Sequence, residues 1–300
     1  MPRILIGVDA GGTKTAVAVS EDSKILGRAD GSGGAVRPGR ALVAATTITE
    51  VVRRALSAAG RLSGDVLLVG AAGAGREPER EELRKALRGE NLAPRVVVTT
   101  DIDIALAAAF DDGPGIVVSA GTGSVAVGRD RAGKRHRIGG YGWQMGDEGS
   151  GYAIGRAALG AVSRAVDERS PKTALSERVL QATRSSDFDA LVRWAATASP
   201  PEVAALAPHV LTVAAEGDQL AQGITDYAAR ELSQLAICLL PKMDLTPPVR
   251  VAVTGGLLGL EQPLRKRLLA KLAEEPAFQT MDTPVEPVLG ALRLADGDQG

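Results

Sequence analysis

The N-terminal part of the chain alternates between short apolar runs and turn residues. Three such runs, at 3–9, 14–20 and 24–30, have the spacing of an antiparallel meander. Apolar residues then recur at helical spacing over 40–59. The pattern continues with a strand, a charged helix, a strand and an alanine-rich helix, at 66–69, 77–89, 96–98 and 102–110. The predicted order is therefore three strands, helix, strand, helix, strand, helix.

The second half of the chain repeats this opening. Apolar runs at 115–119, 125–128 and 134–138 predict a second meander, and a long helix is expected to begin near Asp147. The chain then has helical character over 152–241. A buried strand, an amphipathic helix and a last helix are predicted at 249–254, 261–274 and 288–295.

The cluster Asp111-Asp112-Gly113-Pro114 is a strong turn signal between these halves. We predict an α/β protein with an N-terminal domain over 1–113 and a C-terminal domain over 114–300. The second domain would carry the helical region 152–241, and its last helix could return to the first domain.

Composition narrows the classes of function. The chain has 300 residues, 45% of them hydrophobic, and a formal net charge of -1 with both signs interspersed. Such a surface has no field that would attract nucleic acid or an anionic membrane, so neither is an expected partner. No apolar stretch reaches membrane-spanning length, and no basic region precedes the first apolar run, so the cytoplasm is the expected location.

Cys238 is the only cysteine. An intramolecular disulfide and a multi-cysteine metal site within one chain are therefore excluded. Its apolar neighbours predict that Cys238 is buried in the core.

Glycine-rich loops follow the first strand of each meander. Glycine lets backbone N–H groups approach a polyphosphate closely, and threonine or serine hydroxyls add neutral donors. An acid at the end of the strand, Asp9, can hold Mg²⁺ directly or through water. The predicted phosphate-binding residues are Gly11, Gly12, Thr13, Lys14 and Thr15 in the first loop, and Gly121, Thr122, Gly123 and Ser124 in the second.

Several motifs occur in an order that resembles the sugar kinase, actin and heat-shock chaperone superfamily, and within it the N-acetylglucosamine kinase and BadF/BadG-type ATPase family. The resemblance extends from Gly7 to about Ala295. It rests on Gly-Val-Asp-Ala-Gly-Gly-Thr-Lys-Thr at 7–15, Thr-Thr-Asp at 99–101, Ser-Ala-Gly-Thr-Gly-Ser at 119–124, the segment 139–151, and Thr-Gly-Gly at 254–256.

The resemblance implies two ribonuclease-H-like domains of the actin-like ATPase type around an interdomain cleft. It implies that both loops hold ATP phosphates, with Mg²⁺, and that Gly255 and Gly256 lie against the adenosine. It also implies that Asp101 is the general base. Asp103, two residues later, is a competing acid, although a carboxylate there can simply complement the helix dipole.

The resemblance further implies an amino-sugar acceptor bound near Ala35, Asp101, Gly140, Tyr141, Gly142 and Asp147. N-acetylglucosamine, phosphorylated at the 6-hydroxyl, is the expected acceptor, with glucosamine or N-acetylmuramic acid as alternatives. Two departures bear on the acceptor: Ala35 stands where relatives carry asparagine, and Tyr141 where many carry tryptophan.

Arg37 and Tyr141 could then recognise an acid or amine, or Arg37 could be a solvated loop residue. A homodimer is expected, as in relatives.

An actin-like switch or an activator ATPase without a sugar substrate is the alternative from another class. The single cysteine argues against an activator, because activators share a cluster held by at least two cysteines from each subunit.

Overall fold

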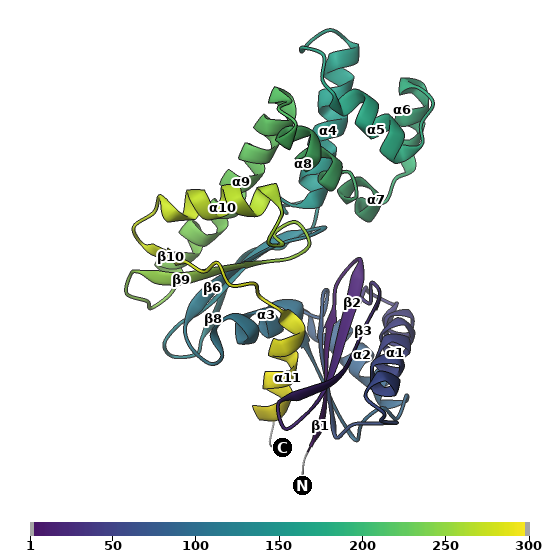
Figure 1. Ribbon diagram of the computed structural model, residues 1–300, viewed down its shortest axis with the longest axis vertical. Coiled ribbons are helices and arrows are strands. Elements are labelled where there is room, and N and C mark those ends of the chain that lie inside the picture. The colour runs from purple at the N-terminus through teal and green to yellow at the C-terminus, as the bar shows by residue number, and fades with distance from the viewer. Residues whose placement is uncertain (1–2, 298–300) are drawn as a thin grey trace. The chain divides into compact units, whose positions relative to one another are not determined.

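The computed structural model describes residues 3–297, and the chain divides into two compact units after Gly113 and after Pro284. The first unit contains one five-stranded mixed sheet with the order β3-β2-β1-β4-β5 (Figure 1). The three N-terminal strands are antiparallel, and β1, β4 and β5 are parallel. The elements are β1 (Ile4–Ala10), β2 (Lys14–Glu21), β3 (Lys24–Ser32), α1 (Ala41–Ala58), β4 (Val66–Ala71), α2 (Glu77–Arg88), β5 (Arg95–Thr100) and α3 (Asp101–Phe110).

Helices cover both faces of this first sheet (Figure 1). Buried residues of α1 and α2 pack with the sheet in one cluster, which includes Ile48, Leu83 and Val69. A second cluster joins the opposite face to α3 and to the last helix, α11 (Pro287–Gly297). The C-terminal helix therefore belongs to the core of the first unit.

The approach of α11 to the first unit depends on two glycines. A Cβ on Gly290 of α11 would lie 1.8 Å from the carbonyl oxygen of Ile104 in α3. A Cβ on Gly7 of β1 would lie 2.8 Å from the carbonyl oxygen of Val288. Residues 285–297 belong with the first unit, so the last helix returns to the first domain, the possibility left open when 114–300 was predicted as the second domain.

The second unit contains the other five-stranded mixed sheet, with the order β10-β9-β6-β7-β8. Strand β6 is antiparallel to β7 and parallel to β9. The elements are β6 (Gly115–Ala120), β7 (Ser124–Arg129), β8 (Arg135–Gly139), α4 (Gly151–Val166), α5 (Leu175–Thr183), α6 (Phe188–Thr197), α7 (Pro200–Ala204), α8 (Ala207–Ala215), α9 (Gln219–Leu239), a 3-10 turn (Leu240–Lys242), β9 (Val249–Thr254), α10 (Pro263–Ala273) and β10 (Phe278–Thr280).

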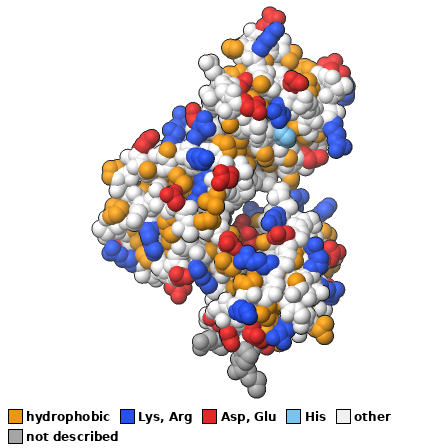
Figure 2. All heavy atoms as spheres, viewed as in Figure 1, with side chains coloured by type: hydrophobic (Ala, Val, Ile, Leu, Met, Phe, Trp, Pro, Cys, Tyr) orange, Lys and Arg blue, Asp and Glu red, His pale blue; other side chains and the backbone are white. Residues whose placement is uncertain are grey.

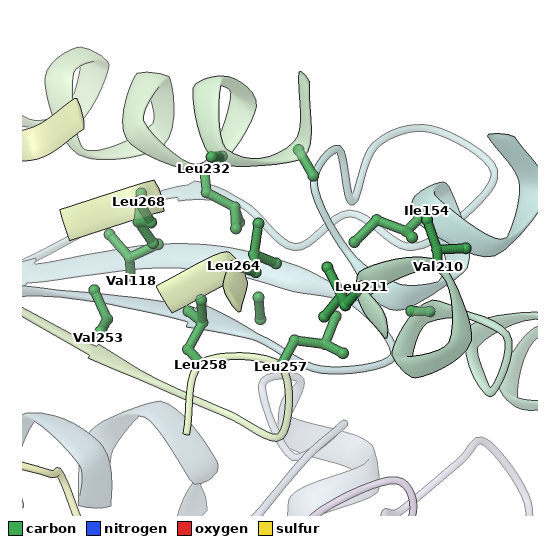
Figure 3. Close-up of a cluster of buried hydrophobic side chains, with 14 of the residues drawn as sticks. Val118, Ile154, Val210, Leu211, Leu232, Val253, Leu257, Leu258, Leu264 and Leu268 are labelled. Atoms are coloured by element: carbon green, nitrogen blue, oxygen red, sulfur yellow. The ribbon is translucent and has the colours of Figure 1, made fainter. Parts of the chain in front are cut away.

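One hydrophobic cluster continues from the second sheet into the helical region. Val118 and Val253 come from the strands, and Leu232 and Leu268 from α9 and α10, as Figure 3 shows. Ile154, Val210 and Leu211 extend the same cluster to α4 and α8. The region 152–241 therefore shares the core of the sheet that carries it. The α/β class and the two ribonuclease-H-like topologies predicted from the sequence are confirmed.

The long helix α4 begins at Gly151, not near Asp147 as predicted. Asp147 and Gly149 have φ angles of 63° and 76°, which a right-handed helix does not allow. Ser150 then caps the helix, because its Oγ accepts the backbone N–H of Ala153 at 3.2 Å. Asp147 therefore lies in a turn before the helix and not in its first turn.

The expected burial of Cys238 is wrong. The buried face of α9 includes Leu232, Ala236 and Leu239, and Cys238 is exposed. An apolar neighbourhood in sequence does not bury a helical residue when the helix turns that position away from the core.

Two further features of the described residues concern membrane-spanning helices and the distribution of surface charge. Among residues 3–297, no helix has both the length and the apolar character needed to cross a bilayer. Lys and Arg side chains are interspersed with Asp and Glu on the face shown in Figure 2. The near-zero formal charge is therefore spread over that face as small patches of both signs.

We predict that Gly290→Ala lowers the free energy of unfolding by about 2–3 kcal/mol, since the methyl group would overlap the backbone of α3. Urea unfolding followed by circular dichroism measures the change. Gly160→Ala, within α4, is the matched control, because a Cβ there meets only the end of Arg164 at 3.6 Å. The control should be neutral or stabilising by up to about 1 kcal/mol. Equal losses in both variants would contradict the packing argument.

Candidate functional site

The first glycine loop joins β1 to β2 in a tight turn. The backbone N–H of Gly11 donates to the carbonyl of Lys14 at 2.9 Å, and Gly12, Thr13 and Lys14 are exposed. The loop is backed by a second segment, since a Cβ on Gly33 would lie 2.3 Å from the carbonyl oxygen of Gly12. This exposed turn has the shape that lets backbone N–H groups meet an anion.

The hydroxyl of Thr15, predicted to bind phosphate, is engaged within the first sheet. Its side chain is fully buried, and its Oγ1 donates to the carbonyl of Ser32 at 2.8 Å. A hydroxyl has one proton to donate, and in this structure that proton joins β2 to β3.

Two carboxylates lie at the same edge of the first sheet. The parallel register pairs Ala10 with Ala71, and Ala71 with Thr100, so the ends of β1, β4 and β5 are level. Asp9 lies one residue before the end of β1, and Asp101 follows β5 directly. Burial, and next the negative charge of Asp101, raise the pKa of Asp9 to about 7, and the charge of Lys14 opposes the rise.

The side chain of Asp103 makes its hydrogen bonds at the start of α3. Its Oδ2 accepts the backbone N–H of Thr100 at 3.3 Å and the hydroxyl of Thr99, and its own N–H donates to the Oγ1 of Thr100 at 3.1 Å. These contacts form a capping box. They give Asp103 a structural role, and they favour Asp101 as the reactive acid of the pair.

Two ion pairs line the same cavity as Asp9. Lys14 lies 3.0 Å from Asp30, and Arg28 lies 2.9 Å from Glu286. These four side chains and Asp9 line a cavity of about 310 Å³. The cavity therefore combines two cations and their acidic partners with the half-buried Asp9, a mixture suited to an anion accompanied by a cation.

The carboxylates in the first unit fit Mg²⁺. Mg²⁺ is usually held by one or two carboxylates together with substrate phosphates. A divalent cation would also relieve the repulsion between Asp9 and Asp101, which contributes to the raised pKa of Asp9. Among residues 3–297 no cluster of three or more acidic, histidine or cysteine side chains could hold a metal. The fit to Mg²⁺ rests on the two carboxylates alone, and Asp9 stays the predicted magnesium ligand.

The second glycine loop lies at the corresponding edge of the other sheet. The backbone N–H of Gly121 donates to the carbonyl of Gly123 at 2.9 Å, and Gly121 accepts from Gly151 at 2.8 Å. Gly255, after β9, has a φ of 102°, and a Cβ there would lie 2.3 Å from the carbonyl oxygen of Ala120. A Cβ on Gly256 would meet no atom within 4 Å. The Gly255-Gly256 turn therefore touches the start of the loop and leaves open space beside it.

Asp147 lies against this loop. It is 8% exposed, its Oδ1 has no hydrogen-bond partner among the described residues, and a Cβ on Gly123 would lie 2.7 Å from its Oδ2. Burial raises the pKa of Asp147, and the charge of Glu148 adds to the rise. Backbone N–H groups of Ser124 and Gly142 lower it, as does the charge of Arg137. A buried acceptor without a partner is a place where a ligand hydroxyl can donate.

The hydroxyl of Ser124, also predicted to bind phosphate, is engaged within the second unit. Ser124 is 4% exposed, and its Oγ donates to the carbonyl of Glu148 at 2.7 Å. In this structure the single proton of the hydroxyl is therefore used within the protein.

The segment from Gly139 to Met145 is exposed and built on left-handed glycines. Gly140 and Gly142 have φ angles of 70° and 95°. Tyr141, between them, is 68% exposed. The ring of Trp143 lies 5.1 Å from that of Tyr152, measured between centroids. Gly140, Tyr141 and Gly142 thus form an accessible loop that precedes Asp147.

Arg137 is a residue of this site that sequence reasoning missed. Its guanidinium donates to the carbonyl of Gly139 at 3.0 Å and to that of Gly140, and lies 5.9 Å from the ring centre of Tyr141. The only signal in the sequence was a charged residue within a predicted strand, which is common on exposed strands.

Ala35 and Arg37 lie after the third strand. The backbone N–H of Ala35 donates to the carbonyl of Gly11 at 3.1 Å, which places Ala35 beside the first loop. Arg37 is exposed, and its carbonyl accepts the N–H of Arg40 at 2.9 Å. These contacts bring Ala35 to the first loop and show no side-chain contact of Arg37 to that loop.

Two ribonuclease-H-like sheets, each with a glycine loop at the end of its first strand, define an actin-like ATPase fold. The chain belongs to the BadF/BadG/BcrA/BcrD ATPase family, which matches residues 6–295. The family resemblance seen in the motifs is therefore confirmed.

Named relatives include sugar kinases. The N-acetylmuramic acid/N-acetylglucosamine kinase of Clostridium acetobutylicum is 30% identical over 259 residues, covering 85% of each chain. The N-acetyl-D-glucosamine kinase of Dictyostelium discoideum is 28% identical over 313 residues, covering 98% of each. The solved structure of a proposed N-acetylglucosamine kinase from Chromobacterium violaceum has a TM-score of 0.82 at 28% identity, covering 98% of this chain and 99% of that one.

We predict that Asp9→Asn stabilises the unliganded protein at pH 8 and not at pH 4. The pKa of Asp9 in the folded protein is about 7, whereas the ordinary pKa of an aspartate is 3.8, so the contribution of Asp9 to stability falls as pH rises between these values. Asparagine cannot ionise, so the variant does not lose this stability as the pH rises. The expected gain in the free energy of unfolding at pH 8 is about 1–3 kcal/mol.

Urea titrations at the two pH values measure this difference. Asp22→Asn, in the exposed turn before β3, is the control and should show no such pH dependence. A gain for Asp9→Asn that is equal at pH 4 and pH 8 would contradict the assignment.

Proposed function

We propose that the protein is an ATP-dependent amino-sugar kinase. The observation that carries the proposal is the pairing of an exposed glycine loop with Asp9 and Asp101 at one sheet edge. Membership of an ATPase family and the sugar kinases among its relatives support it. An acid next to a phosphate-binding loop suits the transfer of a phosphoryl group to an alcohol.

In this proposal Asp101 is the general base. It would take the proton of an acceptor hydroxyl as that oxygen attacks the terminal phosphorus of ATP and ADP leaves. Its place directly after β5 supports the role, and the capping contacts of Asp103 argue against the competing acid. Mg²⁺, when bound by Asp9 with the phosphates, would supply positive charge that stabilises the transferring group.

The glycine loops would bind the nucleotide. Gly11, Gly12, Thr13 and Lys14 would meet phosphate oxygens from the first unit. Gly121, Thr122 and Gly123 would do so from the second, with Gly255 and Gly256 beside the adenosine. The exposed first turn and the open space at Gly256 support these assignments.

Asp147 would bind a hydroxyl of the acceptor, with Gly140, Tyr141, Gly142 and Ala35 around the sugar. The unpartnered Oδ1 of Asp147 and the exposure of Tyr141 support this part. We infer N-acetylglucosamine, phosphorylated on its 6-hydroxyl, as the first acceptor to test, with glucosamine and N-acetylmuramic acid next. The proposal includes a homodimer, and use of ATP would place the protein in the cytoplasm.

We predict that one amino sugar stimulates ADP release from Mg·ATP to a turnover of about 1–100 per second. A coupled ADP-release assay with N-acetylglucosamine, glucosamine, N-acetylmuramic acid, N-acetylmannosamine and glucose measures it. ATP hydrolysis that no sugar stimulates, together with filaments on pelleting, would contradict the kinase and favour an actin-like switch.

We predict that Asp101→Asn lowers kcat for the preferred sugar by about 10²–10⁴-fold, because the amide cannot accept the proton. Nucleotide binding should change little. Asp103→Asn is the matched control, since it keeps the oxygen that accepts the Thr99 and Thr100 contacts and should retain most of the activity. A larger loss in Asp103→Asn than in Asp101→Asn would assign the base to Asp103.

A further inference from the structure

Ser124 connects the two functional loops of the second unit. It is the first residue of β7, directly after the glycine loop, and its buried Oγ donates to the carbonyl of Glu148 at 2.7 Å. Glu148 is the neighbour of Asp147 in the chain, so one side-chain hydrogen bond ties the end of the glycine loop to the segment that carries Asp147.

Backbone contacts strengthen this connection. The N–H of Tyr152 donates to the carbonyl of Thr122 at 3.3 Å, in addition to the bond between Gly151 and Gly121. Gly123 lies so close to Asp147 that a Cβ would reach 2.7 Å from its Oδ2. A shift of Asp147 would therefore displace residues 121–124 as well, because packed backbone segments move together.

We propose that Ser124 couples acceptor binding to nucleotide binding by holding the Asp147 turn against the glycine loop. The inference rests on the proposed function, in which Asp147 binds the acceptor and residues 121–123 bind phosphates. Ser124 would be a positioning residue, because its hydroxyl is occupied within the protein by the carbonyl of Glu148.

The state of Asp147 without a ligand explains why coupling is expected. Its Oδ1 is buried without a partner among the described residues, and its backbone has a φ of 63°. An acceptor hydroxyl that donates to Oδ1 would remove the cost of the unpaired acceptor and stabilise the turn as it stands. Through the hydrogen bond of Ser124, the stabilised turn would also hold the glycine loop in its present conformation. Because linkage is reciprocal, nucleotide would strengthen acceptor binding by the same factor.

The coupling can be measured by binding alone. Trp143 and Trp194 are the only tryptophans, so Trp194→Phe leaves Trp143, in the loop before Asp147, as the fluorescent reporter. In that background, the Kd of a non-hydrolysable ATP analogue with Mg²⁺ is titrated with and without saturating acceptor sugar, namely the most active sugar of the panel above. The ratio of the two Kd values is the coupling factor.

The expected factor in the parent protein is about fivefold or more. Ser124→Ala should bring it close to one, and Ser124→Thr, which keeps a hydroxyl, should restore part of it. Ser124→Cys replaces the threonine variant if the added methyl group prevents folding. Ser163→Ala is the matched control, because Ser163 in α4 also donates its hydroxyl to a backbone carbonyl, that of Gly160 at 3.1 Å. The control should keep the full factor.

The outcomes separate this inference from the proposed function. A merely structural Ser124 would weaken both ligands in the alanine variant and leave the coupling factor unchanged, which would overturn the inference. A parent protein that binds both ligands without coupling would also overturn it. Failure of every sugar to bind or to stimulate turnover would instead overturn the kinase on which the inference rests.

Discussion

The parallel pairing of strands is the constraint that positions the candidate residues within each unit. In the first sheet it brings the ends of β1, β4 and β5 level, so that Asp9 and Asp101 share an edge although they are far apart in the chain. In the second sheet it pairs Ser119 of β6 with Thr254 of β9, which sets the Gly255 turn against the start of the glycine loop. Parallel strands need long crossover connections, and these supply the helices that bury each sheet.

Both units bury a carboxyl group where burial opposes its charge. The pKa of Asp9 is raised to about 7, and that of Asp147 is raised as well. Each arrangement is electrostatically unfavourable in the unliganded protein, since an ionised group loses water without gaining full compensation. A cation at Asp9, or a hydroxyl donor at Asp147, would provide that compensation. The unliganded protein therefore holds these groups in place at a cost to its own stability.

The sequence predicted most of the strands and helices correctly because their apolar residues repeat at the spacing of strands and helices. It missed β10, which is only three residues long, and it placed the start of α4 too early. The positive φ values at Asp147 and Gly149 explain the second error, because a local turn of this kind leaves little trace in an apolar pattern. Cys238 was misplaced for a related reason: apolar neighbours did not reveal which face of α9 meets the core.

The two meanders, the glycine loops and the family could be predicted from the amino-acid sequence, because these are properties of local order and of motifs. The hydrogen bonds of individual side chains could not, because they depend on segments that are distant in the chain. Thr15 and Ser124 carry the hydroxyls expected of phosphate ligands, yet both donate to carbonyls of segments distant in the chain. The capping contacts of Asp103, the contacts of Arg137 and the packing of α11 in the first unit likewise became visible only in three dimensions. Residue type states what a side chain can do, and only its neighbours in space determine which of its hydrogen bonds remain available.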